Sequence, residues 1–144
     1  MWQAIRSLLN RPSSDVVAYR PRQDGRPDPG EVCWAWVPFE EYHSQGKDRP
    51  VLIVGERGRQ WLALMLTSKD HDREAAQQRP DGVAVDRFGH QWMDIGTGAW
   101  DREGRPSEVR LDRLLVLDAV RREGSALDEG TFRRVVAAGQ PLWD

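Results

Sequence analysis

Short apolar runs separated by polar turns recur through the middle of the chain. Residues 31–38 alternate valine and tryptophan with cysteine and alanine, and residues 50–54 and 61–67 are almost wholly apolar. Runs of this length, rich in β-branched and aromatic residues, are typical of strands. We therefore predict three strands over these ranges. A glycine-containing turn at 55–60 joins the second strand to the third.

The second half of the chain continues the pattern more weakly. Short strands are predicted at 82–86 and 91–95, and a longer one at 107–118, where an alternating pattern becomes wholly apolar. A terminal helix of about eleven residues follows Asp128, a favourable N-cap residue, and ends just before Gly139. Its apolar face carries Leu127, Phe132, Val135 and Val136.

The remaining segments lack a strand pattern. Residues 1–10 have helical spacing of apolar side chains and predict a short amphipathic helix that docks on the domain or on a second subunit. Residues 11–30 are rich in proline, glycine and arginine and predict an irregular arm. Polar loops are expected at 39–48, 70–81 and 96–106, with Trp100 pinning the last of them.

These elements predict one mainly β (α+β) domain. A chain of 144 residues has room for one modest core. Five or six short strands, glycine-rich connections and one C-terminal helix favour a small, strongly curved barrel. We expect residues 1–29 to form a short helix and an irregular arm, and residues 30–144 to form the barrel domain.

The composition of the chain limits its possible ligands and the cellular compartment in which it works. The formal charge is −2 and the pI about 5.9, so a nucleic-acid surface has to be a local patch. A single cysteine, Cys33, argues for a reducing compartment and against structural zinc, and no metal site is predicted. No apolar run suggests a signal peptide or a membrane span, so we expect a cytoplasmic protein without membrane contact.

Candidate chemistry gathers around the second and third predicted strands. Arg49 precedes the strand 50–54, and Thr67 and Ser68 end the strand 61–67. If the two strands pair, a guanidinium and a hydroxyl meet on one face of the sheet, which is a phosphate-binding geometry. The only two lysines, Lys47 and Lys69, lie within two residues of Arg49 and Thr67.

Five short motifs follow one another along the chain. They are Gly30-Glu31-Val32-Cys33-Trp34, the segment from Gln45 to Arg49-Pro50-Val51, Leu66-Thr67-Ser68, Val109-Arg110-Leu111-Asp112-Arg113-Leu114 and the terminal helix. In this order they resemble the MazF/PemK family of toxins from toxin–antitoxin pairs, and the resemblance covers roughly residues 30–138.

The resemblance implies an SH3-like barrel that forms a homodimer. It implies an endoribonuclease that cleaves single-stranded RNA through the 2′-hydroxyl, without metal or cofactor. An antitoxin protein would neutralise it by placing a C-terminal peptide in the cleft. Arg49 and Thr67 match the family's catalytic positions, and Gln45, Lys47, Ser68 and Lys69 are the expected substrate-binding residues.

Two positions depart from the family pattern. Ser44 replaces a glutamate often found in the first loop, and Gly46 lies one place earlier than the usual glycine. Either change is expected to weaken catalysis or alter the sequence that is cut. Two other functions therefore stay open: a non-catalytic SH3-like module that binds a peptide or protein, and an inhibitor of a DNA-handling enzyme.

The general base is not identified by the sequence. Glu40, Glu41 and His43 lie in the first loop and have suitable chemistry, although such residues are more often only solvated. Asp112 is interpreted as a structural carboxylate that holds a neighbouring loop. Aromatic faces for unstacked RNA bases are expected among Trp61, Trp92, Trp100 and Tyr42.

Overall fold

The computed structural model describes residues 15–19, 21, 26–68 and 77–143. The predicted helix over residues 1–10 and the candidate residue Lys69 lie outside the described residues. The elements are β1 (Asp15–Val17), β2 (Glu31–Pro38), β3 (Gly46–Arg57), β4 (Gln60–Thr67), β5 (Gln77–Gln78), β6 (Val83–Val85), β7 (Gln91–Gly96), β8 (Ser107–Arg110), β9 (Leu115–Leu117), β10 (Arg121–Ala126), α2 (Glu129–Gly139) and a 3₁₀ helix, η1 (Gln140–Leu142).

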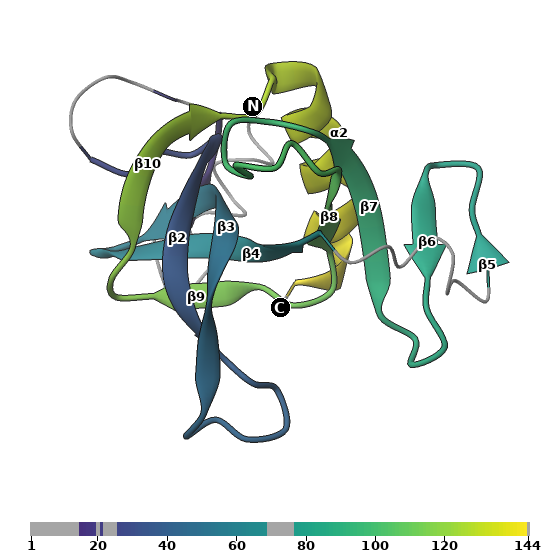
Figure 1. The fold of residues 1–144 in the computed structure, drawn as a ribbon, viewed down its shortest axis with the longest axis horizontal. Helices are drawn as coiled ribbons and strands as arrows, with labels where there is room; N and C mark the ends of the chain where they lie inside the picture. Colours follow the sequence, from purple (N-terminus) through teal and green to yellow (C-terminus); the bar gives the residue numbers. More distant parts are fainter. Residues whose placement is uncertain (1–14, 20, 22–25, 69–76, 144) are drawn as a thin grey trace, which may run out of the picture.

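All the strands of the described residues belong to one sheet with antiparallel pairing. Its order is β10-β2-β3-β4-β8-β7-β6-β5, while β1 pairs with β3 and β9 pairs with β4. Figure 1 shows β2, β3, β4, β9 and β10 curving around one end of the molecule, with β5 and β6 projecting at the other. The prediction of a mainly β domain with a C-terminal helix is confirmed.

The strand β4 organises this sheet because it pairs with several neighbours. Its first residues pair with β9, as in Trp61 with Leu117, and its last residues pair with β8, as in Leu66 with Val109. The prediction of one strand over 107–118 is wrong, because the chain bends between β8 and β9. Asp112 holds the bend: one of its oxygens accepts hydrogen bonds from the Gln91 N–H and the Arg110 Nε–H. The structural interpretation of Asp112 is therefore confirmed.

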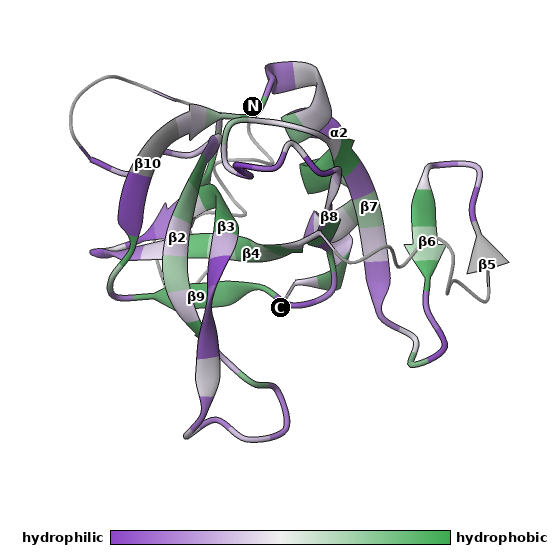
Figure 2. Cartoon of the chain, in the orientation of Figure 1, coloured by the Kyte–Doolittle hydropathy of each residue, from purple (hydrophilic) through white to green (hydrophobic). Residues whose placement is uncertain are grey.

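The central strands are buried on both faces, which explains their continuous apolar sequence. In β3, Leu52 belongs to a core cluster that includes Phe132 of α2, and Val51 belongs to a second cluster with Met65. Figure 2 shows the same contrast along β3, which is hydrophilic near the β2–β3 loop and hydrophobic farther on. The buried part of β3 anchors its polar end.

The terminal helix begins as the sequence predicts. The Asp128 carboxylate accepts a hydrogen bond from the Thr131 N–H at 2.9 Å and caps the first turn. Gly139 is the last residue of α2 instead of the first beyond it, and Gln140 continues into η1. Within the described residues, no helix is long and apolar enough to cross a membrane.

Part of the predicted irregular arm is ordered against the domain. Residues 15–17 form β1, which pairs with β3, and the Tyr19 hydroxyl donates to the Leu127 carbonyl at 2.7 Å. Gly30 has φ +100°, and a Cβ there would meet the Tyr19 ring at 2.6 Å, so this packing requires glycine. The prediction failed at β1 because a three-residue strand is too short to have a detectable period. The polar strand β10 was missed as well.

Candidate functional site

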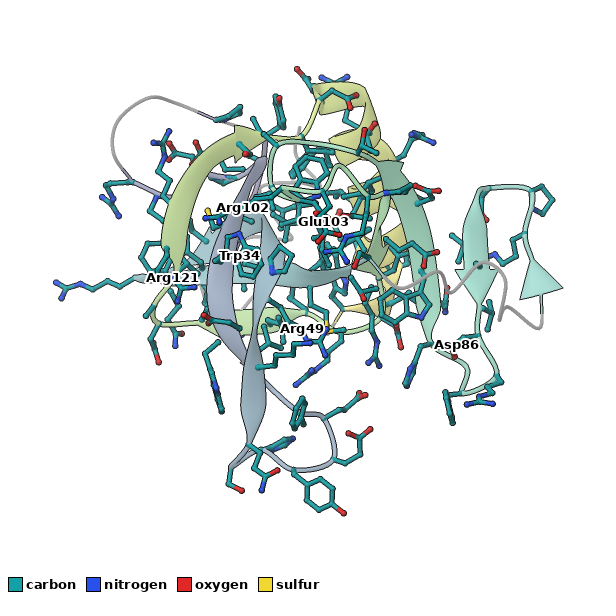
Figure 3. The ribbon with its side chains drawn as sticks, in the orientation of Figure 1. Trp34, Arg49, Asp86, Arg102, Glu103 and Arg121 are labelled. Atoms are coloured by element: carbon teal, nitrogen blue, oxygen red, sulfur yellow. The ribbon has the colours of Figure 1, made fainter. Side chains whose placement is uncertain are left out.

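An open pocket of about 650 Å³ lies among the polar end of β3, the end of β4 and the loop before β8. This volume is within the range of about 300–1,000 Å³ typical of ligand sites. The lining residues are Trp34, Lys47, Asp48, Arg49, Pro50, Leu66, Thr67, Ser68, Ala99, Trp100, Asp101, Arg102, Glu103, Arg105, Ser107 and Arg121. Figure 3 labels several of them.

The pairing of β3 with β4 brings Arg49 and Thr67 to this pocket. The two strands pair from Arg57 and Gln60 as far as Val51 and Met65. Beyond that pair, Arg49 pairs with Ala35 of β2 and Thr67 pairs with Glu108 of β8, so each residue continues its own strand toward the pocket. Both residues are half-buried, as a site that must contact solvent requires.

The polar residues 46–48, which precede Arg49, belong to strand β3 and not to a loop. The sequence predicted a loop over 39–48 and a strand that begins at Pro50, but β3 begins at Gly46. Arg49 pairs with Ala35 and Lys47 with Val37 in β2, so the β ladder holds the backbone of both cations. The low apolar content of 46–49 concealed this strand from hydrophobic pattern analysis.

The pocket is locally positive although the chain carries −2. Five cationic and three acidic side chains line it. Two of the cations are paired: Arg121 contacts Asp48 at 2.8 Å, and Arg105 contacts Asp101 at 2.9 Å. The cationic side chains of this surface come from separate elements of the fold.

The three loop residues considered as general bases do not line the pocket. The Arg110 guanidinium donates to both oxygens of Glu40, at 2.9 Å and 3.1 Å, and these hydrogen bonds hold the pKa of Glu40 below its ordinary value. A carboxylate bound in this way is a weak proton acceptor. Glu41 and His43 are exposed on the same loop.

Arg113 contacts the start of this loop, and its pKa responds to charges on the loop and on Arg49. Its Nη2 donates to the Pro38 carbonyl at 2.8 Å, at the start of the loop. Burial lowers the pKa of Arg113; the nearby positive charges of Arg110 and Arg49 lower it further, and Glu40 and Glu41 oppose this. The acidic loop residues and Arg49 thus act on one shared guanidinium. The sequence singled out the motif that contains Arg113, but not the residue.

The remaining predicted binding residues divide between the pocket and the loop. Lys47 and Ser68 are exposed and line the pocket. Gln45 does not line it; its N–H donates to the Tyr42 carbonyl and its carbonyl accepts from the Phe39 N–H, so its backbone closes the β2–β3 loop. Among the described residues no group of three or more histidine, cysteine, aspartate or glutamate side chains gathers as a metal site.

Sequence reasoning missed most of the pocket-lining residues that lie outside β3 and β4. Trp34, Arg121 and the acidic and basic residues at 101–105 carry no motif that marks them as functional. Trp100 does pin its loop as predicted: it is buried, and its Nε1 donates to the Ser107 hydroxyl at 2.9 Å. Two other tryptophans considered for stacking are used structurally, since Trp92 donates to Asp86 and Trp61 to the Pro27 carbonyl.

Comparison with known protein families assigns the chain. A model of PemK-like, MazF-like toxins of type II toxin–antitoxin systems matches residues 28–138, well over half of the chain. The chain belongs to this toxin family. The match covers every pocket-lining residue of this PemK/MazF-like toxin, and membership in a type II system implies a cognate antitoxin. No curated protein and no solved structure matched the chain.

Proposed function

We propose that this toxin is a metal-independent endoribonuclease that cleaves single-stranded RNA. The observation that carries the proposal is that Arg49 and Thr67, from adjacent strands, line one open and locally positive pocket. Membership in the PemK/MazF-like family supports the same activity.

The proposed reaction uses the 2′-hydroxyl of the RNA as the nucleophile. Its oxygen attacks the adjacent phosphorus, the bond to the 5′-oxygen of the next nucleotide breaks, and a 2′,3′-cyclic phosphate forms. Arg49 stays protonated and stabilises negative charge on the phosphate oxygens. Thr67 donates a hydrogen bond to a phosphate oxygen and holds the scissile group in line.

The group that accepts the proton of the 2′-hydroxyl is assigned to the β2–β3 loop. Glu40 is the least suitable of the three residues there, because the bidentate hydrogen bonds of Arg110 occupy its carboxylate. Glu41 and His43 take no part in those hydrogen bonds, and both are exposed on the same loop. We therefore assign the base to Glu41 or His43, and substitution by glutamine at each position separates them.

The finer family features belong to this proposal as well. The bend of the chain between β8 and β9, with both strands paired to β4, supports a closed SH3-like barrel. The homodimer that the family resemblance implies is part of the same proposal. The antitoxin would place a peptide in the RNA site and block it.

A cleavage assay in EDTA tests the activity. We expect the wild-type protein to cut single-stranded RNA, and Arg49→Ala and Thr67→Ala to reduce the rate by about 10²-fold or more. Thr67→Ser should retain much of the rate because the hydroxyl remains. Arg59→Ala is the matched control, since Arg59 lies in the exposed β3–β4 turn and does not line the pocket. Circular dichroism checks that each variant is folded.

Two outcomes would reject the proposal. If RNA with 2′-deoxy sugars is cut as fast as normal RNA, the 2′-hydroxyl mechanism is wrong. If folded Arg49→Ala and Thr67→Ala cut as fast as the wild type, the site assignment is wrong. Absence of cleavage over a broad panel of RNA, with peptide binding in the pocket, would select the non-catalytic module. Growth arrest with intact cellular RNA would favour inhibition of a DNA-handling enzyme.

A further inference from the structure

The loop between β7 and β8 lines one side of the pocket, and a side chain buried in the core anchors this loop. The Trp100 side chain is 6% exposed and belongs to the core cluster that also contains Leu66. A Cβ on Gly98 would meet the Trp100 ring at 2.1 Å, so the ring packs directly on the glycine backbone. The loop thus has a tryptophan anchor inside the domain.

A network of hydrogen bonds fixes the turn that follows Trp100. The Asp101 carboxylate accepts from the Glu103 N–H and from the Arg105 Nε–H, both at 2.9 Å. The Asp101 N–H donates to the Gly98 carbonyl, and the Gly104 N–H donates to the Asp101 carbonyl. These bonds lie on both sides of Arg102 in the sequence. The backbone that carries Arg102 is therefore set in place before any ligand binds.

The charge of Arg102 is not used within the described part of the chain. Arg105 is neutralised by Asp101 and lies 3.4 Å from Glu103, and Arg121 is paired with Asp48. Among the described residues Arg102 makes no ion pair, and its side chain is exposed where the loop lines the pocket. A rigid turn thus presents a guanidinium that has no ion pair within the described residues to a pocket that also contains Lys47 and Arg49.

We propose that Arg102 is a second phosphate-binding residue, which contacts the RNA backbone one or more phosphates away from the group held by Arg49. This inference rests on the proposed function, because it takes single-stranded RNA as the ligand. Both Arg102 and Arg49 line the pocket, and Figure 3 labels them on different elements of the fold. A guanidinium suits this role because it donates two parallel hydrogen bonds to phosphate oxygens and remains charged.

Two separated cations favour a chain of phosphates over a single small anion. Arg49 is carried by a strand of the sheet and Arg102 by the loop before β8, so both are fixed by their own backbone supports. A preorganised site of this kind loses little conformational freedom on binding. Arg102 would bind substrate without contacting the reacting atoms, so it is a substrate-positioning residue and not a catalytic one.

Salt-dependent binding tests the proposal. The probe is a fluorescent single-stranded RNA with 2′-fluoro sugars, which lack the attacking hydroxyl and cannot be cut. For single strands, the slope of log affinity against log salt changes by about 0.7 for each phosphate contact. We expect Arg102→Gln to weaken binding at low salt by roughly 5- to 20-fold and to reduce the slope by about that amount. Arg102→Lys should keep the slope and lose part of the affinity.

Arg59→Gln is the matched control, because it removes the same charge at an exposed turn that does not line the pocket. An Arg102→Gln slope equal to that of Arg59→Gln would overturn the inference. In normal RNA, Arg102→Gln should raise KM more than it lowers kcat, and the opposite result would overturn the positioning role.

The two proposals fail in different ways. Cleavage by the wild type with no effect of Arg102→Gln rejects the inference alone. Binding of the uncut probe without cleavage of normal RNA rejects the endoribonuclease proposal. In that case the salt dependence of probe binding by Arg102→Gln still tests whether Arg102 contacts a phosphate. If the wild type neither binds nor cleaves single-stranded RNA, both are rejected.

Discussion

The Arg110 guanidinium binds two carboxylates at once, those of Glu40 and Asp112. Its side chain is only 6% exposed, and it donates two hydrogen bonds to each partner. Asp112 shapes the bend after β8, whereas Glu40 belongs to the β2–β3 loop. This arrangement ties the loop that leads into β3, and hence to Arg49, to the other half of the sheet.

Loss of the Glu40 carboxylate should loosen the loop. Glu40→Gln removes the charge partner of a buried guanidinium, although Asp112 still compensates part of it and the Glu40 side chain is 42% exposed. We expect a loss of about 1 kcal/mol in unfolding free energy after allowance for solvent screening. Urea denaturation measures it, with Glu41→Gln as the control on the same loop. Equal stabilities of the two variants would contradict the anchoring role.

The same pair predicts a dependence of stability on pH. The Arg110 hydrogen bonds lower the pKa of Glu40 from its ordinary value of 4.5. A carboxylate with a lowered pKa in the folded state stabilises the protein above the pKa of the unfolded state, and this contribution is lost as pH falls. Wild-type stability should therefore decline below about pH 4.5 more steeply than that of Glu40→Gln. Parallel pH profiles for the two proteins would argue against the linkage.

Asp86 should be essential for the turn between β6 and β7. Its side chain is 4% exposed and accepts hydrogen bonds from the Phe88 N–H, the His90 N–H and the buried Trp92 Nε1–H. Asp86→Ala would leave the Trp92 donor without its acceptor inside the domain, at a cost of about 2–3 kcal/mol. Thermal unfolding measures the loss. Asp86→Asn retains an acceptor and should lose less stability. If both variants lose the same stability, the charge of Asp86 contributes more than its hydrogen bonds.

The Trp100 anchor should not tolerate a methyl group on Gly98. The added Cβ would meet the Trp100 ring at 2.1 Å, so the ring or the loop backbone has to move. We expect Gly98→Ala to cost about 1–3 kcal/mol and to change the near-ultraviolet circular dichroism of tryptophan.

The control for this change is Gly130→Ala in α2. Its Cβ would lie 3.5 Å from the Asp128 carboxylate, an ordinary contact, and alanine favours a helix. The control should be as stable as the wild type or more so. Equal behaviour of the two glycine variants would show that the close packing of Trp100 on Gly98 is not required.

Local pattern and capping chemistry were sufficient for β2, β4 and the start of α2. The alternating residues of β2, the apolar residues of β4 and the N-cap Asp128 each have a signal within a few positions, because side-chain periodicity and hydrogen bonding of the first helical turn are local properties. The pairing of β3 with β4 was also predictable, since a short turn joins two adjacent apolar runs. For that reason the sequence could place Arg49 and Thr67 near each other, and both line the pocket. Their catalytic roles stay a prediction.

Tertiary structure decided what depends on partners distant in the chain. Glu40 was a possible base in the sequence but is an anchor in the fold, because its partner Arg110 lies 70 residues away. Arg102 had no distinguishing motif, and only the packing of Trp100 and the pairing of its basic neighbours single it out. The sequence by itself determined the apolar strands and the cap of α2, because their signals are local. Long-range packing determined which ionisable side chains are held in ion pairs, because the partners lie far apart in the chain.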